Sequence, residues 1–111
     1  MIKYGSDTIR ELRFESFQER IEVRDRQWVD IELRFVLAAD TPGPDDLIDL
    51  TALVITNTEG RIAQIVPQDE GIDCDYQFTF SEKEQLAAFV NGDAMQQKIA
   101  KRVSQSADKL W

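Results

Sequence analysis

The strongest pattern in the chain is the alternation of apolar and polar residues over positions 27–40. Every second position is apolar, namely Val29, Ile31, Leu33, Phe35 and Leu37. Successive side chains of a strand point to opposite faces, so this period of two indicates a strand with one buried face. It is the longest such run in the chain, and we therefore expect the neighbouring strands to pair with it.

The segment just before this run predicts the first hairpin. Ile21 and Val23 alternate with charged residues, and residues 25–27 form a short polar connection. A three-residue loop places Val23 opposite Val29 and Ile21 opposite Ile31, so that the apolar side chains share one face. A two-residue turn would mix the apolar and charged faces. The three-residue loop is therefore the prediction.

The start of the chain is less regular. Residues 1–7 have no apolar pattern and predict a loose leader. Residues 8–17 fit two structures. Leu12 and Phe14 alternate with charged residues as in a strand, whereas the Thr-x-x-Glu sequence that begins at Thr8 could cap a helix. A strand is the favoured prediction, and the helix alternative stays open.

A second hairpin is predicted after a Pro- and Gly-containing connector. Residues 50–56 are apolar on both sides, which is typical of a strand covered on both faces. Gly60 follows where a three-residue turn needs a left-handed residue. The chain then returns antiparallel and ends at Pro67, which places Leu53 opposite Ile65.

The C-terminal third predicts one more strand and then helices. Residues 75–80 alternate, with three aromatic side chains on one face: Tyr76, Phe78 and Phe80. Ser81 with Glu84 forms a capping box that begins a helix, and Gly92 ends it. Asp93 can cap a second helix, whose apolar side comprises Met95, Ile99, Val103, Ala107 and Leu110.

Together these elements predict an α+β fold. We expect an antiparallel β-meander of five or six strands, as an open sheet or partial barrel, followed by one or two C-terminal helices packed on it. The length of 111 residues suits a single domain over 1–111. Within it we expect the leader at 1–7, the sheet over 8–80 and the helices over 81–110.

The charge is negative and unevenly distributed. The formal net charge is −8, yet residues 98–111 hold four of the 13 Lys and Arg and one of the 21 Asp and Glu. A negative field repels nucleic acid and anionic lipid and favours basic partners, although solubility is its ordinary explanation. Cys74 is the only cysteine, and neither a signal peptide nor a membrane span is visible. A cytoplasmic location is the prediction.

Missing residue types exclude most enzyme chemistry. The chain has no histidine and no glycine-rich phosphate-binding motif, so histidine-based catalysis is excluded and no phosphate loop is visible. Cys74 lies between Asp73 and Asp75, which disfavour a thiolate, and we interpret it as a small buried apolar residue. We therefore predict a protein that is not an enzyme, with no catalytic residues and no cofactor.

The predicted meander brings two acidic connectors to one end of the sheet. We call the resulting set the acidic rim: Asp40, Asp45, Asp46, Asp49, Asp69, Glu70 and Asp73. Such a rim could dock a basic surface. It could also hold a divalent cation, although we favour the prediction that it holds no metal. The EF-hand spacing is absent, and Asp is in any case common in turns.

Other candidates lie outside the rim. The last helix carries Lys98, Lys101, Arg102 and Lys109 beside its apolar stripe, which more often indicates a packed helix than a membrane or partner contact. The candidate partner-binding residues are Asp45, Asp46, Asp49, Asp69, Glu70, Asp73, Trp28 and Trp111.

These observations favour a small acidic protein-binding module. We predict an accessory, assembly or regulatory factor that docks a larger, basic protein partner. One alternative is a polyanion-mimicking inhibitor or immunity protein. Another is a carrier that holds a small ligand in a cavity under the C-terminal helices. The oligomeric state does not follow from the sequence.

Overall fold

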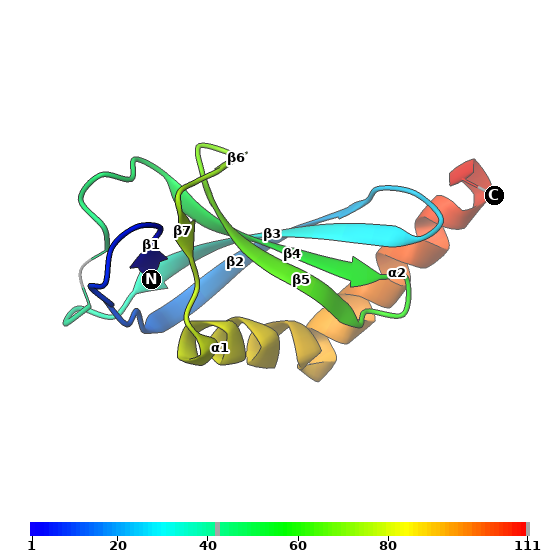
Figure 1. The fold of residues 1–111 in the computed structure, drawn as a ribbon. Helices are drawn as coiled ribbons and strands as arrows, with labels where there is room; N and C mark the ends of the chain where they lie inside the picture. The colour runs from blue at the N-terminus through cyan, green and yellow to red at the C-terminus, as the bar shows by residue number, and fades with distance from the viewer. Residues whose placement is uncertain (42, 111) are drawn as a thin grey trace.

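The alternating run forms strand β3 (Trp28–Leu37), which belongs to an open five-stranded antiparallel sheet of order β2-β3-β4-β5-β6 (Figure 1). The other strands are β2 (Phe14–Val23), β4 (Leu50–Asn57), β5 (Ile62–Asp69) and β6 (Ile72–Asp73). Two helices, α1 (Phe80–Asn91) and α2 (Asp93–Leu110), pack on the sheet. The computed structural model describes residues 1–41 and 43–110, with the backbone alone for 108–110. The predicted α+β meander with C-terminal helices is confirmed.

The register of the first hairpin follows the apolar pattern. Ile21 pairs with Ile31 and Val23 with Val29, as predicted. The carboxylate of Asp25 closes the loop by accepting hydrogen bonds from two backbone amides of the turn, both at 2.8 Å. A short acidic side chain thereby satisfies donors that the ladder leaves unpaired.

The core lies between one face of the sheet and the two helices. Both helices lie on the same side of the sheet (Figure 1), and the residues at the centre of the face towards them are buried. The buried apolar set includes Val29, Ile31, Leu33, Ala52, Val54, Leu86, Val90, Met95 and Ile99. Phe17 of β2 stacks on Phe89 of α1 with ring centroids 4.6 Å apart, which joins the sheet to the first helix.

Strand β4 is covered by the helices on one face and only partly covered on the other, where Thr51 is buried, so the expectation of two covered faces holds only in part. Ala52 and Val54 face the helices and are buried. Leu53 and Ile55 point to the other face and are half-buried. The continuous apolar run of β4 therefore indicates a strand at the centre of the sheet and does not require a further layer of helices or strands on each face.

The second hairpin departs from its predicted register by one residue. Gly60 has a φ of +81°, as the predicted three-residue turn requires. A β-bulge follows it, however, because one extra residue is inserted in β5 near its start. Leu53 consequently pairs with Val66, and Ile65 pairs with Val54 on the helix side.

Pro67 lies inside β5 and does not end it, contrary to the sequence prediction. Its carbonyl oxygen accepts a hydrogen bond from the thiol of Cys74 at 3.7 Å, so it points away from β4. The nitrogen and carbonyl of one residue point to the same side of a strand. The proline nitrogen therefore faces the outer edge, and the ladder with β4 loses no hydrogen bond.

The first seven residues are not a loose leader. Ile2–Lys3 form β1, which pairs with β7 (Tyr76–Gln77), and Met1 is 2% exposed. The strand favoured for residues 8–17 is present from Phe14 onwards, whereas residues 8–13 form neither a regular strand nor a helix. These residues contain a single bridge, from Ile9 to Ile2.

The expected strand over 75–80 is cut short by an earlier helix start. The capping box is formed by Thr79 and Glu82, two residues before the predicted Ser81 with Glu84. As a result Phe78 is buried at 3% exposure, while Phe80 is in the first turn of α1 and 78% exposed. The aromatic alternation therefore does not describe one strand face.

Helix α2 begins at Asp93, as predicted, and buries Met95 and Ile99. Val103 and Ala107 are half-buried farther along the same helix. The side chain of Leu110, the last predicted core residue, lies outside the description. No helix in the described part of the chain is both long and apolar enough to cross a membrane.

Candidate functional site

The two acidic connectors do meet at one end of the sheet. The Asp69 carboxylate accepts hydrogen bonds from the backbone amides of Ile48 at 3.0 Å and Asp49 at 2.7 Å. The amide of Glu70 donates to the carbonyl of Asp49 at 3.1 Å. Asp69 thus serves first to order the connector, because its oxygens satisfy amides that have no ladder partner.

Asp46 is occupied by two partners from distant parts of the chain. Its carboxylate accepts hydrogen bonds from Lys3 at 2.7 Å and from the Tyr76 hydroxyl at 2.6 Å. The bond from Lys3, followed by that from Tyr76, lowers the pKa of Asp46 to about 2. This carboxylate holds β1 and β7 against the connector.

Further rim carboxylates are paired with arginine. Arg34 binds Asp49 through two hydrogen bonds of 2.7 and 3.1 Å, which lower the pKa of Asp49. Arg13 forms an ion pair with Asp40 and likewise lowers its pKa. Internal pairing weakens the field that the rim presents to a partner.

The remaining rim residues divide into two groups. Asp45 and Glu70 take part in none of the ion pairs within residues 1–41 and 43–107. Asp73 accepts a hydrogen bond from the side chain of Gln68 at 3.1 Å. Over the described residues, no three acidic or cysteine side chains are grouped so as to hold a metal ion.

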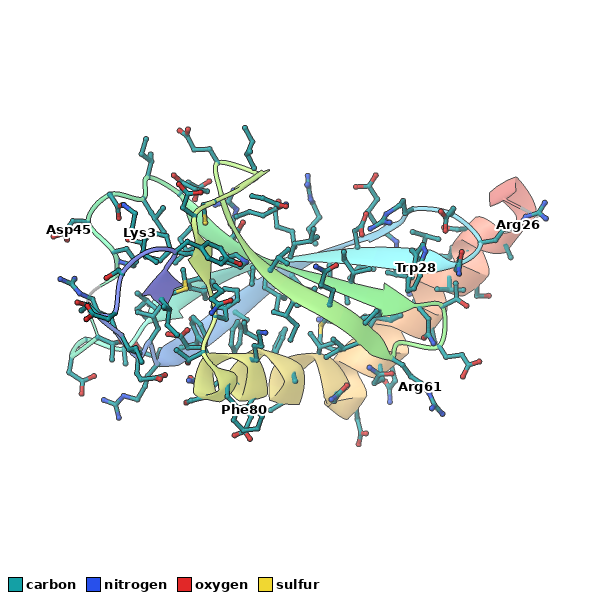
Figure 2. All side chains as sticks on the ribbon, in the orientation of Figure 1. Lys3, Arg26, Trp28, Asp45, Arg61 and Phe80 are labelled. Atoms are coloured by element: carbon teal, nitrogen blue, oxygen red, sulfur yellow. The ribbon has the colours of Figure 1, made fainter. Side chains whose placement is uncertain are left out.

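The two tryptophans are not part of the rim. Trp28 begins β3 opposite Asn57 and is half-buried. Figure 2 shows Lys3 and Asp45 at one end of the molecule and Trp28 and Arg61 towards the other. Trp111 falls outside the described residues.

The basic residues of α2 have a structural role in one case. Lys98 forms an ion pair with Glu19 of β2, and the hydrogen bond from Lys98 lowers the pKa of that carboxyl. Lys101 and Arg102 are exposed beside it. The side chain of Lys109 is not among those described.

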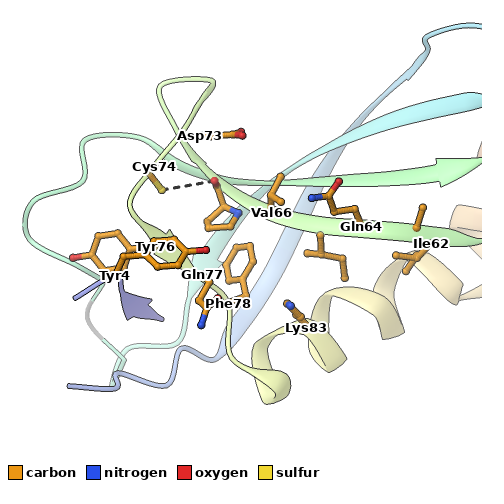
Figure 3. A pocket seen from close by; sticks show the side chains of 13 residues that line it. Tyr4, Ile62, Gln64, Val66, Asp73, Cys74, Tyr76, Gln77, Phe78 and Lys83 are labelled. Atoms are coloured by element: carbon orange, nitrogen blue, oxygen red, sulfur yellow. Dashed lines mark hydrogen bonds between the residues drawn. The ribbon is translucent and has the colours of Figure 1, made fainter. Parts of the chain in front are cut away.

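A surface groove lies beside β5, and the periodicity of the sequence did not predict it. Its volume is about 470 Å³, and Figure 3 shows it between β5, the segment that leads to α1, and α1 itself. We call it the β5 groove. It is lined by Tyr4, Ile62, Ala63, Gln64, Ile65, Val66, Pro67, Asp73, Cys74, Tyr76, Gln77, Phe78 and Lys83.

The wall formed by β5 is an unpaired strand edge. Among the described residues, β6 pairs with β5 only at Gln68 and Asp69, so the stretch 62–66 pairs with β4 on one side and with no strand on the other. Strand β7 contacts β5 without pairing with it. The backbone nitrogen and carbonyl of Pro67 face the groove. In a strand, the backbone groups of residues two apart point to the same side. The amide and carbonyl of Ile65 therefore also face the groove, where a further strand could bind them.

The other edge of the sheet is protected in the usual way. Strand β2 carries Glu15, Glu19, Arg20 and Glu22 within ten residues, and α2 contacts it. Charged residues discourage the addition of another strand. β5 has none between Arg61 and Asp69, and this uncharged run is the one sequence signal that could have indicated the groove.

The thiol of Cys74 lines the groove next to Pro67. Burial raises its pKa, so the sulfur stays a neutral thiol at physiological pH. Its half-buried position agrees in part with the expected burial, since it is neither fully enclosed nor exposed. The groove offers apolar surface and backbone hydrogen-bonding groups, and no activated nucleophile at this position.

Comparison with known proteins provides no relative from which a function could be transferred. No family model matches the chain, and no curated protein or solved structure shows significant similarity to it.

Proposed function

We propose that this protein is a non-enzymatic binding module that takes up an extended segment of a partner protein along the open edge of β5. The observation that supports the proposal is the coincidence of two features. The backbone groups of Ile65 face a groove, and no described strand pairs with residues 62–66 on that side. An added strand would satisfy these groups, which is the recurring mode of peptide recognition at sheet edges.

The size of the open edge sets the strength of the contact. β6 closes the edge at Gln68, and the bulge lies near Ile62, so only a short segment fits. Each main-chain hydrogen bond typically contributes a net free energy of about 0.5–1.5 kcal/mol. The backbone alone therefore supports weak binding, and side-chain contacts with the groove must supply the rest.

The partner is a protein in this proposal, and the module acts as an accessory, assembly or regulatory factor in a reducing, cytoplasmic setting. Docking of a basic surface at the acidic rim is less favoured, because Asp40, Asp46 and Asp49 are paired internally. The same pairing disfavours a polyanion mimic. The carrier alternative is less favoured since the space between sheet and helices is filled by buried apolar side chains.

A random peptide library tests the proposal directly. Phage-displayed nonapeptides are selected on the immobilised protein, and enriched sequences are measured by fluorescence anisotropy. We expect enrichment of peptides with strand-forming residues. Ile65→Pro removes the amide that faces the groove and should abolish their binding, while Ile65→Val keeps that amide and should preserve it.

Amide hydrogen exchange provides a second measurement that does not depend on the proline variant folding. In the wild-type protein an enriched peptide should slow exchange of the Ile65 amide and leave amides of β2 unchanged. The proposal is wrong if no sequence is enriched, or if enriched peptides protect another surface instead.

A further inference from the structure

The β5 groove has opposite charges at two separate places along its length. Among the residues that line it, only Asp73 and Lys83 carry a formal charge. Asp73 lies at the closed end, where β6 pairs with Gln68. Figure 3 shows Lys83 in the first turn of α1, below Gln64 and away from Asp73. Lys83 is exposed and forms none of the ion pairs among the described side chains.

The direction of β5 determines which of these two charges the bound segment meets first. β5 runs from Ile62 to Asp69, and it passes above Lys83 at about Gln64 before it reaches the pairing with Asp73. Every strand pair in the sheet is antiparallel, and antiparallel pairing is slightly more stable per residue than parallel pairing. An antiparallel segment would therefore begin beside Asp73 and end beside Lys83.

The faces of the sheet determine the spacing of the charges on that segment. Asp73 pairs with Gln68, whose side chain shares with Val66 the face opposite the helices. Lys83 lies on a helix, and hence on the other face. Side chains of a strand alternate between faces, so the two complementary charges must be an odd number of residues apart. The open stretch 62–66 accommodates a separation of about three residues, or roughly 10 Å.

The residue between the two charges that falls opposite Ile65 meets an apolar surface. Ile65 points to the helix side, where it is half-buried, and Phe78 lines the same part of the groove. A β-branched or aromatic side chain at this position would form a favourable cross-strand pair.

From these observations we infer the partner's chemistry, an inference that rests on the strand pairing proposed above. The bound segment runs antiparallel to β5, with a basic residue first, an apolar residue next, and an acidic residue about three positions after the basic one. The basic residue faces Asp73 and the acidic residue faces Lys83. The order of the two charges along the segment, and not its net charge, determines how tightly the segment binds.

Two capped, fluorescein-labelled hexapeptides of identical composition test this inference by anisotropy at low salt: Thr-Arg-Val-Gln-Glu-Thr and Thr-Glu-Val-Gln-Arg-Thr. We expect the basic-first peptide to bind about threefold to tenfold more tightly, the effect of two solvent-accessible ion pairs. Lys83→Glu should remove or reverse this preference. Lys101→Glu makes the same charge change on α2, outside the groove, and should leave the preference intact.

The outcomes separate the two proposals. Equal binding of both peptides, lost in Ile65→Pro, overturns the inferred polarity and leaves the strand pairing standing. A preference for the acidic-first peptide, or one that survives Lys83→Glu, also overturns the polarity. Failure of both peptides to bind, together with a library that enriches no sequence, overturns both.

Discussion

The carboxylate of Glu82 accepts a hydrogen bond from the backbone amide of Leu12 at 2.7 Å, although 70 positions separate the two residues in the chain. The same carboxylate caps α1 through Thr79 and receives the terminal ammonium of Met1 at 2.5 Å. Neither side of this ion pair has exposed side-chain surface. One buried acid thus joins the first helix to the start of the chain.

We expect Glu82→Leu to destabilise the protein by about 3–5 kcal/mol, because it leaves a buried ammonium and two amides without their acceptor. Urea denaturation followed by circular dichroism measures the loss. Glu84→Leu, at an exposed position of the same helix, is the control and should change stability by less than about 0.5 kcal/mol. Equal effects of the two substitutions would contradict the role assigned to Glu82.

The two phenylalanines at the start of α1 should respond very differently to truncation. Phe78 is 3% exposed and belongs to the core, so Phe78→Ala should cost about 3–5 kcal/mol. Phe80 is 78% exposed, and Phe80→Ala should stay within about 0.5 kcal/mol of the wild type. Thermal or urea unfolding compares them directly. If they shared one buried strand face, as the alternation alone suggests, both would be costly.

Two glycines with nearly equal backbone conformation should differ in their tolerance of alanine. Gly60 has a φ of +81° and Gly71 one of +79°. A Cβ at Gly71 meets nothing within 4 Å, so Gly71→Ala should cost only the left-handed conformation, about 1–2 kcal/mol. A Cβ at Gly60 would collide with the side-chain oxygen of Gln96, so Gly60→Ala should cost more.

Gln96 explains the difference and supplies the control. Its amide donates to the carbonyls of Gly60 and Val90, so displacing it also loses hydrogen bonds. In a Gln96→Ala background, Gly60→Ala should therefore cost no more than Gly71→Ala does in the wild type. A double-mutant cycle of unfolding free energies measures this coupling, and additive effects would contradict it.

Titration of Asp46 tests the contact between the connector and β1. The folded pKa, about 2, is below the ordinary value of 3.8, so the charged carboxylate favours the folded state. Its contribution is present above pH 3.8 and is lost as the pH falls from 3.8 through 2. Carboxyl NMR should give a midpoint near 2, and Lys3→Ala should raise it. A midpoint near 3.8 in the wild-type protein would show that the contact does not form in solution.

Much of the fold was predictable because local patterns and the hairpin turns agree with the tertiary structure. The alternation in β3, the register of Ile21 with Ile31, and the left-handed turn at Gly60 each depend on a few consecutive residues. Helix α2 was predictable for the same reason, since Asp93 and the apolar stripe lie within one segment.

The candidate site was less predictable. Of the predicted partner-binding residues that the structure describes, only Asp73 lines the β5 groove, and the groove depends on where β6 stops pairing with β5. No local pattern states that the chain leaves the edge after Asp73 and turns towards α1. The uncharged run between Arg61 and Asp69 was a signal of that edge, but only in combination with the topology.

The sequence by itself determined the antiparallel meander, its apolar face and the helices that cover it, because these follow from the periodicity of neighbouring side chains. The tertiary structure alone decided which Thr or Ser caps α1, where Met1 is buried, and which edge of the sheet stays open. Each of these depends on residues far apart in the chain, such as Leu12 with Glu82, or Pro67 with Cys74. These contacts stabilise the protein only once the chain has folded, so the periodicity of the sequence does not predict them.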